Sequence, residues 1–321
     1  MEVRDRQGAV GEAHGKVILV GEHVVVYNKP AIAIPFPLSI RAIVKEHMGE
    51  ISIDSSMYVG NLGGMPSKML GLAQTIYRCL ELCQQPKEGI HIKIESEIPM
   101  GRGLGSSASV ATAIVRGIYN HFQKPLLEEE LYSLVEIAEN YAHGKPSGID
   151  MRTVTSEEPI FYQKSQGSSC LASPKPFYMV VADTGEIGDT KTAVAHVNEL
   201  RQQRLSMINA IIDEIEAIVW KAKDAILTGD SKLLGNLLLM NHENLKKLEV
   251  SNLMLDHLVE TAMRAGALGA KLTGGGMGGC IIALTKDMTD ARKVGEALIK
   301  EGAKTVWYFS THSKELIRIK R

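Results

Sequence analysis

A glycine-rich segment near the middle of the chain combines residue types that suit anion binding. Residues 91–98 alternate as a strand does, residues 99–108 read Pro-Met-Gly-Arg-Gly-Leu-Gly-Ser-Ser-Ala, and a helix-forming run follows to residue 122. Glycines let the backbone approach a phosphate, and the free N–H groups at a helix start attract anions. The segment predicts a phosphate site, and a plain strand-to-helix turn capped by serine is the alternative.

Two common nucleotide-binding motifs do not describe this segment. No lysine stands between Gly101 and Ala108, so the Gly-Lys-Ser/Thr ending of a P-loop is missing. The dinucleotide fingerprint expects an acidic residue roughly 20 positions further on, at the end of the next strand. Residues 121–125 here form the expected helix end and a loop. We therefore predict a phosphate loop of a third kind.

Charged residues flank an apolar stretch near the N-terminus. Lys16 precedes residues 17–20, and Glu22 and His23 follow them after a glycine. A lysine at the edge of a buried strand can steady a phosphate or hydroxyl group, and two adjacent polar side chains suit a polyol or hydroxy acid. The alternative for Lys16 is a solvated residue beside a core strand.

Two carboxylates follow the phosphate segment. Glu139 lies on an expected helix, and Asp150 comes after a turn rich in proline and glycine. Phosphoryl transfer uses one carboxylate for Mg²⁺ and another for the attacking hydroxyl. A helix cap or an Asx-turn is the alternative for Asp150.

A second glycine-rich segment lies near the C-terminus. Five of the six residues at 274–279 are glycines, which is too many for a regular helix or strand. The pattern predicts close approach of the backbone to a ligand, with a hinge or tight hairpin as the alternative.

These segments, in this order, resemble the three motifs of the GHMP small-molecule kinases, in the form found in mevalonate kinases. Residues 15–33 are similar to GKVIL-x-GEH-x-VVY-x-KPAIA, residues 103–108 read GLGSSA, and residues 271–280 read KLTGGGMGGC. Residues 139–150 resemble the family's carboxylate segment. A softer likeness covers residues 183–191, where Thr190 keeps its position, whereas Gly185 and Gly188 replace basic residues.

The resemblance implies an α+β fold with two domains. The N-terminal domain is expected to be like ribosomal protein S5 domain 2, and the C-terminal domain to be ferredoxin-like, with the active site in the cleft between them. We place the boundary after the polar segment 163–169, which gives domains at residues 1–173 and 174–321. The implied reaction transfers a phosphoryl group from ATP to the C5 hydroxyl of (R)-mevalonate, in the mevalonate route to isoprenoids.

The resemblance also implies a role for particular residues. Asp150 and Lys16 are the expected catalytic pair, and Ser107 and Glu139 are the expected Mg²⁺ ligands. The expected substrate-binding residues are Glu22, His23, Thr190 and Gly275, with His23 facing an anion. The residues expected to hold the phosphates of ATP are Gly101, Gly103, Leu104, Gly105, Ser106, Ser107 and Ala108.

The composition excludes several other classes. With 45% hydrophobic and 23% charged residues among 321, and 36 basic against 37 acidic residues, the chain has no global field for nucleic acid or a membrane. The charged N-terminal residues 1–7 lack a signal-peptide core, so a cytoplasmic enzyme is expected. Cys79 and Cys83 could share a metal on one helix face, but no second ligand pair with zinc spacing lies near.

Hydrophobic periodicity predicts the elements that position these residues. Clustered strands favour α+β over a doubly wound sheet. Strands are expected at 17–20, 24–27, 31–34, 40–45, 51–53, 91–98 and 177–182, and from 280 onward. Helices are expected at 67–84, 106–122, 128–143, 190–228, 231–248 and 252–265, and Cys170 is placed in a loop.

Two rival functions stay open from the residues. A sister kinase would act on phosphomevalonate, homoserine or another small alcohol, although no extra basic residue stands beside Glu22 and His23 for a second phosphate. A ligand sensor without activity would usually have lost a catalytic group, yet Lys16, Ser107 and Glu139 are present, as is Asp150. The oligomeric state is open as well, a homodimer being one alternative.

Overall fold

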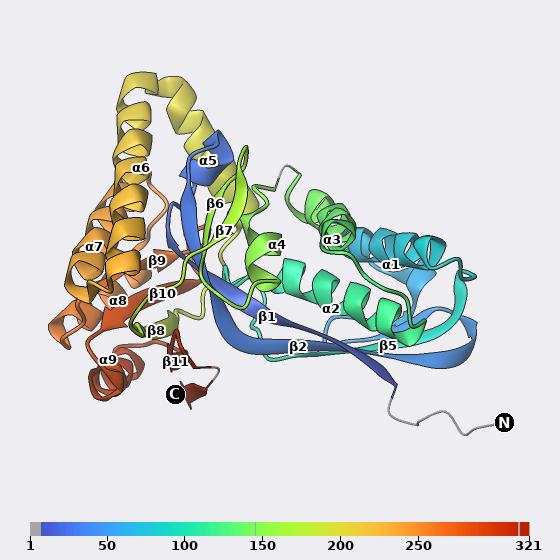
Figure 1. Ribbon diagram of the computed structural model, residues 1–321. Coiled ribbons are helices and arrows are strands. Elements are labelled where there is room, and N and C mark those ends of the chain that lie inside the picture. Colours follow the sequence, from blue (N-terminus) through green and yellow to red (C-terminus); the bar gives the residue numbers. More distant parts are fainter. Residues whose placement is uncertain (1–7, 145, 314, 321) are drawn as a thin grey trace. The chain divides into compact units, whose positions relative to one another are not determined.

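The computed structural model describes residues 8–144, 146–313 and 315–320 (Figure 1). The charged N-terminal residues 1–7, on which the expected lack of a signal peptide depends, lie outside the described residues. Contacts divide the chain into two compact units, each made of separate stretches of sequence. Unit 1 comprises residues 1–15, 38–99 and 105–155, and unit 2 comprises residues 16–37, 100–104 and 156–321. The sequence analysis placed a single domain boundary after residue 173, whereas these units alternate along the chain. That boundary stays a prediction.

Unit 1 combines part of a mixed sheet, in which β3 and β5 pair in parallel and the other pairs are antiparallel, with helices that cover it (Figure 1). Neighbouring strands follow the order β4-β3-β5-β2, and residues 40–46 of β2 pair with β5 in an antiparallel register. Along this part of β2 buried and more exposed residues alternate, as expected for a sheet with one covered face. The elements are β2 (Ala31–Glu50), β3 (Ser52–Asp54), β4 (Val59–Asn61), β5 (Glu88–Ser96), α1 (Leu70–Leu82), α2 (Ser106–His121), α3 (Glu128–His143) and α4 (Ile149–Val154).

Helix α2 is the central element of unit 1. Its apolar residues Ala111, Ile114 and Ile118 are fully buried, and the helix contacts β5, α1, α3 and α4. This packing places the N-terminal turn of α2, which begins at Ser106, in the same compact unit as the helices that carry Glu139 and Asp150.

Unit 2 is built on a five-stranded antiparallel sheet in the order β12-β11-β8-β10-β9. Strand β10 is buried at all six positions, because helices α8 and α9 pack against the sheet. Figure 1 shows α6 and α7 running side by side in this unit, and they are in contact. The elements are β8 (Tyr178–Asp183), β9 (Gly269–Thr273), β10 (Cys280–Thr285), β11 (Thr305–Ser310), β12 (Leu316–Lys320), α5 (Thr190–Gln203), α6 (Leu205–Thr228), α7 (Ser231–Lys247), α8 (Leu253–Arg264) and α9 (Met288–Lys300).

The first motif, residues 15–33, spans the end of the first strand, a turn and the start of β2. β1 (Ala9–Val20) pairs with β2, and a single turn of 3₁₀ helix, η1 (Val24–Tyr27), follows it in unit 2. In the same unit, β6 (Ile160–Gln163) pairs with the first residues of β2 and with β7 (Gly167–Cys170). No helix among the described residues is both long and apolar enough to span a membrane.

The structure corrects four of the expected elements. Residues 24–27 form a 3₁₀ turn and not a strand, because Gly21 and His23 take positive φ values of 101° and 63° and reverse the chain. The expected helix 190–228 is two helices, α5 and α6, because Arg204 has φ −134° and ψ 51°. Residues 31–34 and 40–45 belong to the single strand β2, and Cys170 ends strand β7.

Candidate active site

Three loops of unit 2, two of which carry expected site residues, are joined by backbone hydrogen bonds. These are residues 100–104, 184–189 and 274–279. The Gly188 N–H donates to the Gly101 carbonyl over 2.9 Å, and the Gly279 N–H donates to the Glu186 carbonyl over 2.9 Å. The structure thus brings the first glycine segment of the phosphate motif beside the C-terminal one.

The two glycine segments approach so closely that side chains would not fit between them. A Cβ on Gly274, where φ is 82°, would lie 2.9 Å from the Gly103 Cα. A Cβ on Gly103 would lie 3.1 Å from the Thr273 carbonyl oxygen. This contact explains the glycines at both positions without a ligand. The backbone N–H of Lys16 donates to the Leu104 carbonyl over 3.0 Å, so β1 is attached to the same loop.

Arg102 holds the phosphate segment to the end of β8. Its Nε lies 2.8 Å from an oxygen of Asp183, and its Nη2 donates to the Gly185 carbonyl over 3.0 Å. Both side chains are largely buried. Sequence reasoning missed this contact, because Arg102 and Asp183 are far apart in the chain and nothing local signals the pair.

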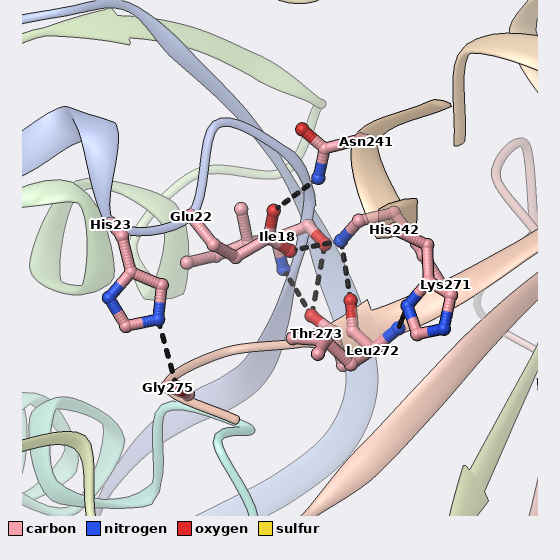
Figure 2. A network of polar contacts seen from close by, with 9 residues as sticks. All are labelled: Ile18, Glu22, His23, Asn241, His242, Lys271, Leu272, Thr273 and Gly275. Atoms are coloured by element: carbon pink, nitrogen blue, oxygen red, sulfur yellow. Dashed lines mark hydrogen bonds and ion pairs between the residues drawn. The ribbon is translucent and has the colours of Figure 1, made fainter. Parts of the chain in front are cut away.

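The turn after β1 brings three of the expected substrate residues together. Gly21 is required there, since a Cβ would lie 2.6 Å from the Ala31 Cα. The next residues turn His23 towards the C-terminal glycine segment, where its Nε2 donates to the Gly275 carbonyl over 2.9 Å (Figure 2). A Cβ on Gly275 would in turn lie 2.8 Å from the Thr190 Cα. His23, Gly275 and Thr190 therefore form one cluster.

His23 is a neutral hydrogen-bond acceptor in this setting. Burial lowers the pKa of His23 to about 4, with the charges of Lys271 and His196 adding to this effect and the bond to Gly275 opposing it. Since a carbonyl only accepts, Nε2 carries the proton and Nδ1 is left with a lone pair. Nδ1 is buried and has no hydrogen-bond partner among the described residues. A neutral acceptor suits a hydroxyl group, whereas the sequence analysis expected His23 to face an anion.

The pKa of His23 predicts a pH-dependent stability. Between pH 6.5 and about 4 the unfolded chain binds a proton that folded His23 does not, so the free energy of unfolding falls as the pH drops through this range. The contribution is complete above pH 6.5 and amounts to roughly 3 kcal/mol. His242, whose pKa burial also lowers to about 4, acts in the same direction.

Urea unfolding at pH 7.5 and 5 tests this expectation. His23→Asn keeps a residue that tolerates positive φ but cannot titrate. We expect the variant to lose less stability between the two pH values than the wild type does, while His242 keeps part of the dependence. Equal losses in both proteins would contradict the assignment.

Glu22, which the sequence analysis expected to bind substrate, lies in a buried polar cluster (Figure 2). The residue is 1% exposed, and both of its carboxylate oxygens are engaged. One accepts a hydrogen bond from Lys271 Nζ, and the other accepts from Asn241 Nδ2 over 3.1 Å. Lys271 stands in the third motif without a predicted role, and no sequence pattern indicated Asn241.

The other residues expected to hold the phosphates of ATP, Gly105 to Ala108, lie at the start of helix α2 in unit 1. Gly105, with φ 77°, is the N-cap, and no side chain caps the helix. The alternative of a serine cap is therefore wrong for Ser106 and Ser107. The first N–H groups of α2 have no intrahelical acceptor and carry the positive end of the helix dipole, which suits an anion. Ala108 is buried beneath them.

The two expected carboxylates lie on neighbouring helices of unit 1. Glu139 is on α3 and is 3% exposed, and Asp150 is the second residue of α4, half-buried after Gly148. Both helices contact α2. Among the described residues, no group of three or more His, Cys, Asp and Glu could hold a metal. Cys79 and Cys83 are buried thiols whose pKa values burial raises, which disfavours metal binding there.

Comparison with known proteins defines the class of this protein. Family models for the N-terminal and C-terminal domains of GHMP kinases match residues 73–156 and 222–304. The chain belongs to the GHMP kinase family. The α+β fold with two domain types predicted from the motifs is confirmed, and so is an enzyme that uses ATP as co-substrate.

Within the family, the chain is similar to mevalonate kinases. The chain is 35% identical to the mevalonate kinase of Pyrococcus furiosus over 86% of this chain and 88% of that one, and 36% identical to that of Pyrococcus horikoshii over the same shares. The crystal structure of the L. major mevalonate kinase in complex with R-mevalonate superposes with a TM-score of 0.83 at 27% identity, covering 97% and 98% of the two chains. The Methanococcus jannaschii mevalonate kinase gives a TM-score of 0.80, also at 27% identity, covering 95% and 98%.

Proposed function

We propose that this chain phosphorylates the C5 hydroxyl of (R)-mevalonate with ATP, giving 5-phosphomevalonate and ADP. The observation that carries the proposal is the identity of 33–36% with mevalonate kinases over more than four fifths of both chains. The arrangement of unit 2 supports it, because the phosphate segment, Lys16 and the cluster of His23, Gly275 and Thr190 are joined by short contacts.

Asp150 and Lys16 are the proposed catalytic pair. Asp150 orients the C5 hydroxyl and accepts its proton, so that the oxygen attacks the γ-phosphorus while the bond to the β-phosphate oxygen breaks and ADP leaves. Lys16 is 2% exposed, and its ammonium stabilises the negative charge on the hydroxyl oxygen and the phosphoryl group. Little covalent chemistry is left to the protein, so most of the catalysis comes from position and charge.

The glycine segment and the start of α2 are proposed to hold the phosphates of ATP. The residues concerned are those predicted from the motif, from Gly101 to Ala108. Backbone N–H groups supply the hydrogen bonds, and the first turn of α2 contains no acidic residue that would repel a phosphate.

Ser107 and Glu139 are proposed to hold Mg²⁺. A hydroxyl and a carboxylate are hard oxygen ligands, and Mg²⁺ commonly binds through one or two carboxylates together with phosphates and water. The donor set therefore fits an ion shared with ATP better than an all-protein cage, consistent with the lack of a larger ligand cluster among the described residues. The ion, when bound, neutralises charge on the β- and γ-phosphates.

His23, Thr190 and Gly275 are proposed to bind mevalonate. Nδ1 of His23 accepts a hydrogen bond from a substrate hydroxyl, because it is the ring nitrogen left without a proton. The Thr190 hydroxyl lies beside Gly275 and can donate to a carboxylate oxygen.

A coupled assay for ADP release tests the function. It compares mevalonate, phosphomevalonate, homoserine and galactose at equal ATP and Mg²⁺. We expect turnover with mevalonate to exceed that with the other three by at least tenfold. Preference for phosphomevalonate would instead favour a sister kinase, and no ADP release with any substrate would favour a ligand sensor. We propose a cytoplasmic location from the composition, and the homodimer stays a prediction.

A further inference from the structure

A buried polar cluster surrounds Glu22 in unit 2, and we call it the Glu22 cluster. It consists of Glu22, Lys271, Asn241, His242 and Asp256. Glu22 comes from the turn after β1, Lys271 from β9, Asn241 and His242 from α7, and Asp256 from α8. Figure 2 shows the ammonium of Lys271 and the amide of Asn241 directed at the two oxygens of Glu22.

Both carboxylate oxygens of Glu22 already accept a hydrogen bond from within the cluster. The carboxylate is bound by a charged donor and an amide donor, and the side chains of Glu22 and Lys271 are 1% and 0% exposed. Such a pair is sensitive to loss of one partner, since the other charge is then buried without compensation. Replacement of both partners by neutral groups is better tolerated.

Further hydrogen bonds hold the side chain of Lys271 and the backbone next to it. Its Nζ also donates to the Leu272 carbonyl, and the Leu272 N–H donates to His242 Nδ1 over 3.4 Å. The Nε2 of His242 donates in turn to Asp256 over 3.2 Å. The Lys271 ammonium is thus held by bonds that involve β9, α7 and α8, and Glu22 pairs with it.

Two residues of the proposed site, His23 and Lys16, depend on the Glu22 cluster. His23 follows Glu22 directly and has φ 63°, a conformation that a histidine keeps only when its neighbours hold it. Lys16 lies close enough to Lys271 that its charge, after burial, further lowers the pKa of Lys271. The carboxylate of Glu22 therefore offsets positive charge beside Lys16 and secures the turn that carries His23.

We propose that Glu22 is a positioning residue that acts through Lys271, in place of the substrate contact expected from the sequence. The inference rests on the proposed function for the identity of the substrate. Because the phosphate segment has its own hydrogen bonds to Gly185 and Gly188, the effect falls on the mevalonate side of the site.

A double-mutant cycle tests the proposal. The variants are Glu22→Gln, Lys271→Met and the two combined, with kcat and the KM for mevalonate and ATP measured for each. We expect each single change to raise the mevalonate KM at least about tenfold, with the ATP KM within about threefold of wild type. We expect the double variant to lose at least about tenfold less in kcat/KM than the product of the single losses.

The outcomes separate positioning from other roles. Losses that multiply in the double variant would mean that Glu22 touches the substrate itself, and the proposal would be overturned. Unchanged KM values with less folded protein would mean a purely structural pair, which also overturns it. The exposed pair Arg292 and Glu296 on α9 is the control, in which we expect single and double changes to have little effect.

Folding and substrate identity are controlled separately. The same cycle is measured by urea unfolding without substrate, where we expect the double variant to be more stable than Glu22→Gln. If Glu22→Gln does not fold, Glu22→Asp keeps the charge and shortens the side chain, and the same rise in mevalonate KM is expected. If the wild type prefers another alcohol in the assay, the proposed function fails, and the kinetic cycle is run with that alcohol instead.

Discussion

Asp150→Asn is expected to lower kcat by at least about two orders of magnitude, the lower range for loss of a general base. Asparagine has nearly the same shape as aspartate but cannot accept the proton of the C5 hydroxyl. Substrate binding is largely kept, so kcat and kcat/KM should fall together. The variant should fold normally, because Asp150 is half-buried in a short helix whose N-cap is Gly148.

Steady-state kinetics with mevalonate and ATP measure this effect. The matched control is Asp54→Asn at the end of β3, which makes the same chemical change elsewhere in unit 1 and should leave kcat within about twofold of wild type. Full turnover by the Asp150→Asn enzyme would remove this residue from the role of base.

Lys16→Met is expected to lower kcat by about 10²–10³, the range for removal of one preorganised charge or donor that stabilises the transition state. Methionine fills similar space without the charge. Since Lys16 is 2% exposed, its ammonium acts in a site with little water, where electrostatic stabilisation is strong. The backbone bond from residue 16 to the Leu104 carbonyl does not depend on the side chain and should persist.

Thermal unfolding and kinetics of the same preparation distinguish loss of catalysis from loss of fold. Lys93→Met on β5 is the control, because this lysine is half exposed and its pair with Glu95 lies at the surface. A Lys16→Met enzyme with wild-type kcat would show that the lysine serves only to support β1.

The class of this protein was evident in the sequence because its chemistry depends on local patterns. The spacing of glycines in residues 101–105 and 274–279 reports backbone conformations that other residues rarely adopt, and the structure confirms positive φ values at most of these glycines. The apolar period of α2 likewise reports its buried face. These signals come from neighbours in the chain, so they can be read without a fold.

Local patterns also misled where backbone reversal or a helix break competed with propensity. The valines at 24–26 favour a strand, yet the positive φ values before them turn the chain into η1. The apolar spacing through residues 190–228 continues across Arg204, because both α5 and α6 have a buried face. The hydrophobic pattern therefore does not show the break between the two helices.

The family, the reaction class and the candidate residues could all be predicted from local sequence patterns. Only the tertiary structure showed what some of those residues contact. Glu22 looked like a substrate ligand until Lys271 and Asn241, more than 200 positions away, were seen to occupy its oxygens. His23 looked suited to an anion, whereas burial lowers the pKa of its ring and favours the neutral form. Charge state and hydrogen-bond capacity depend on which distant groups share a buried space, and no local pattern records that.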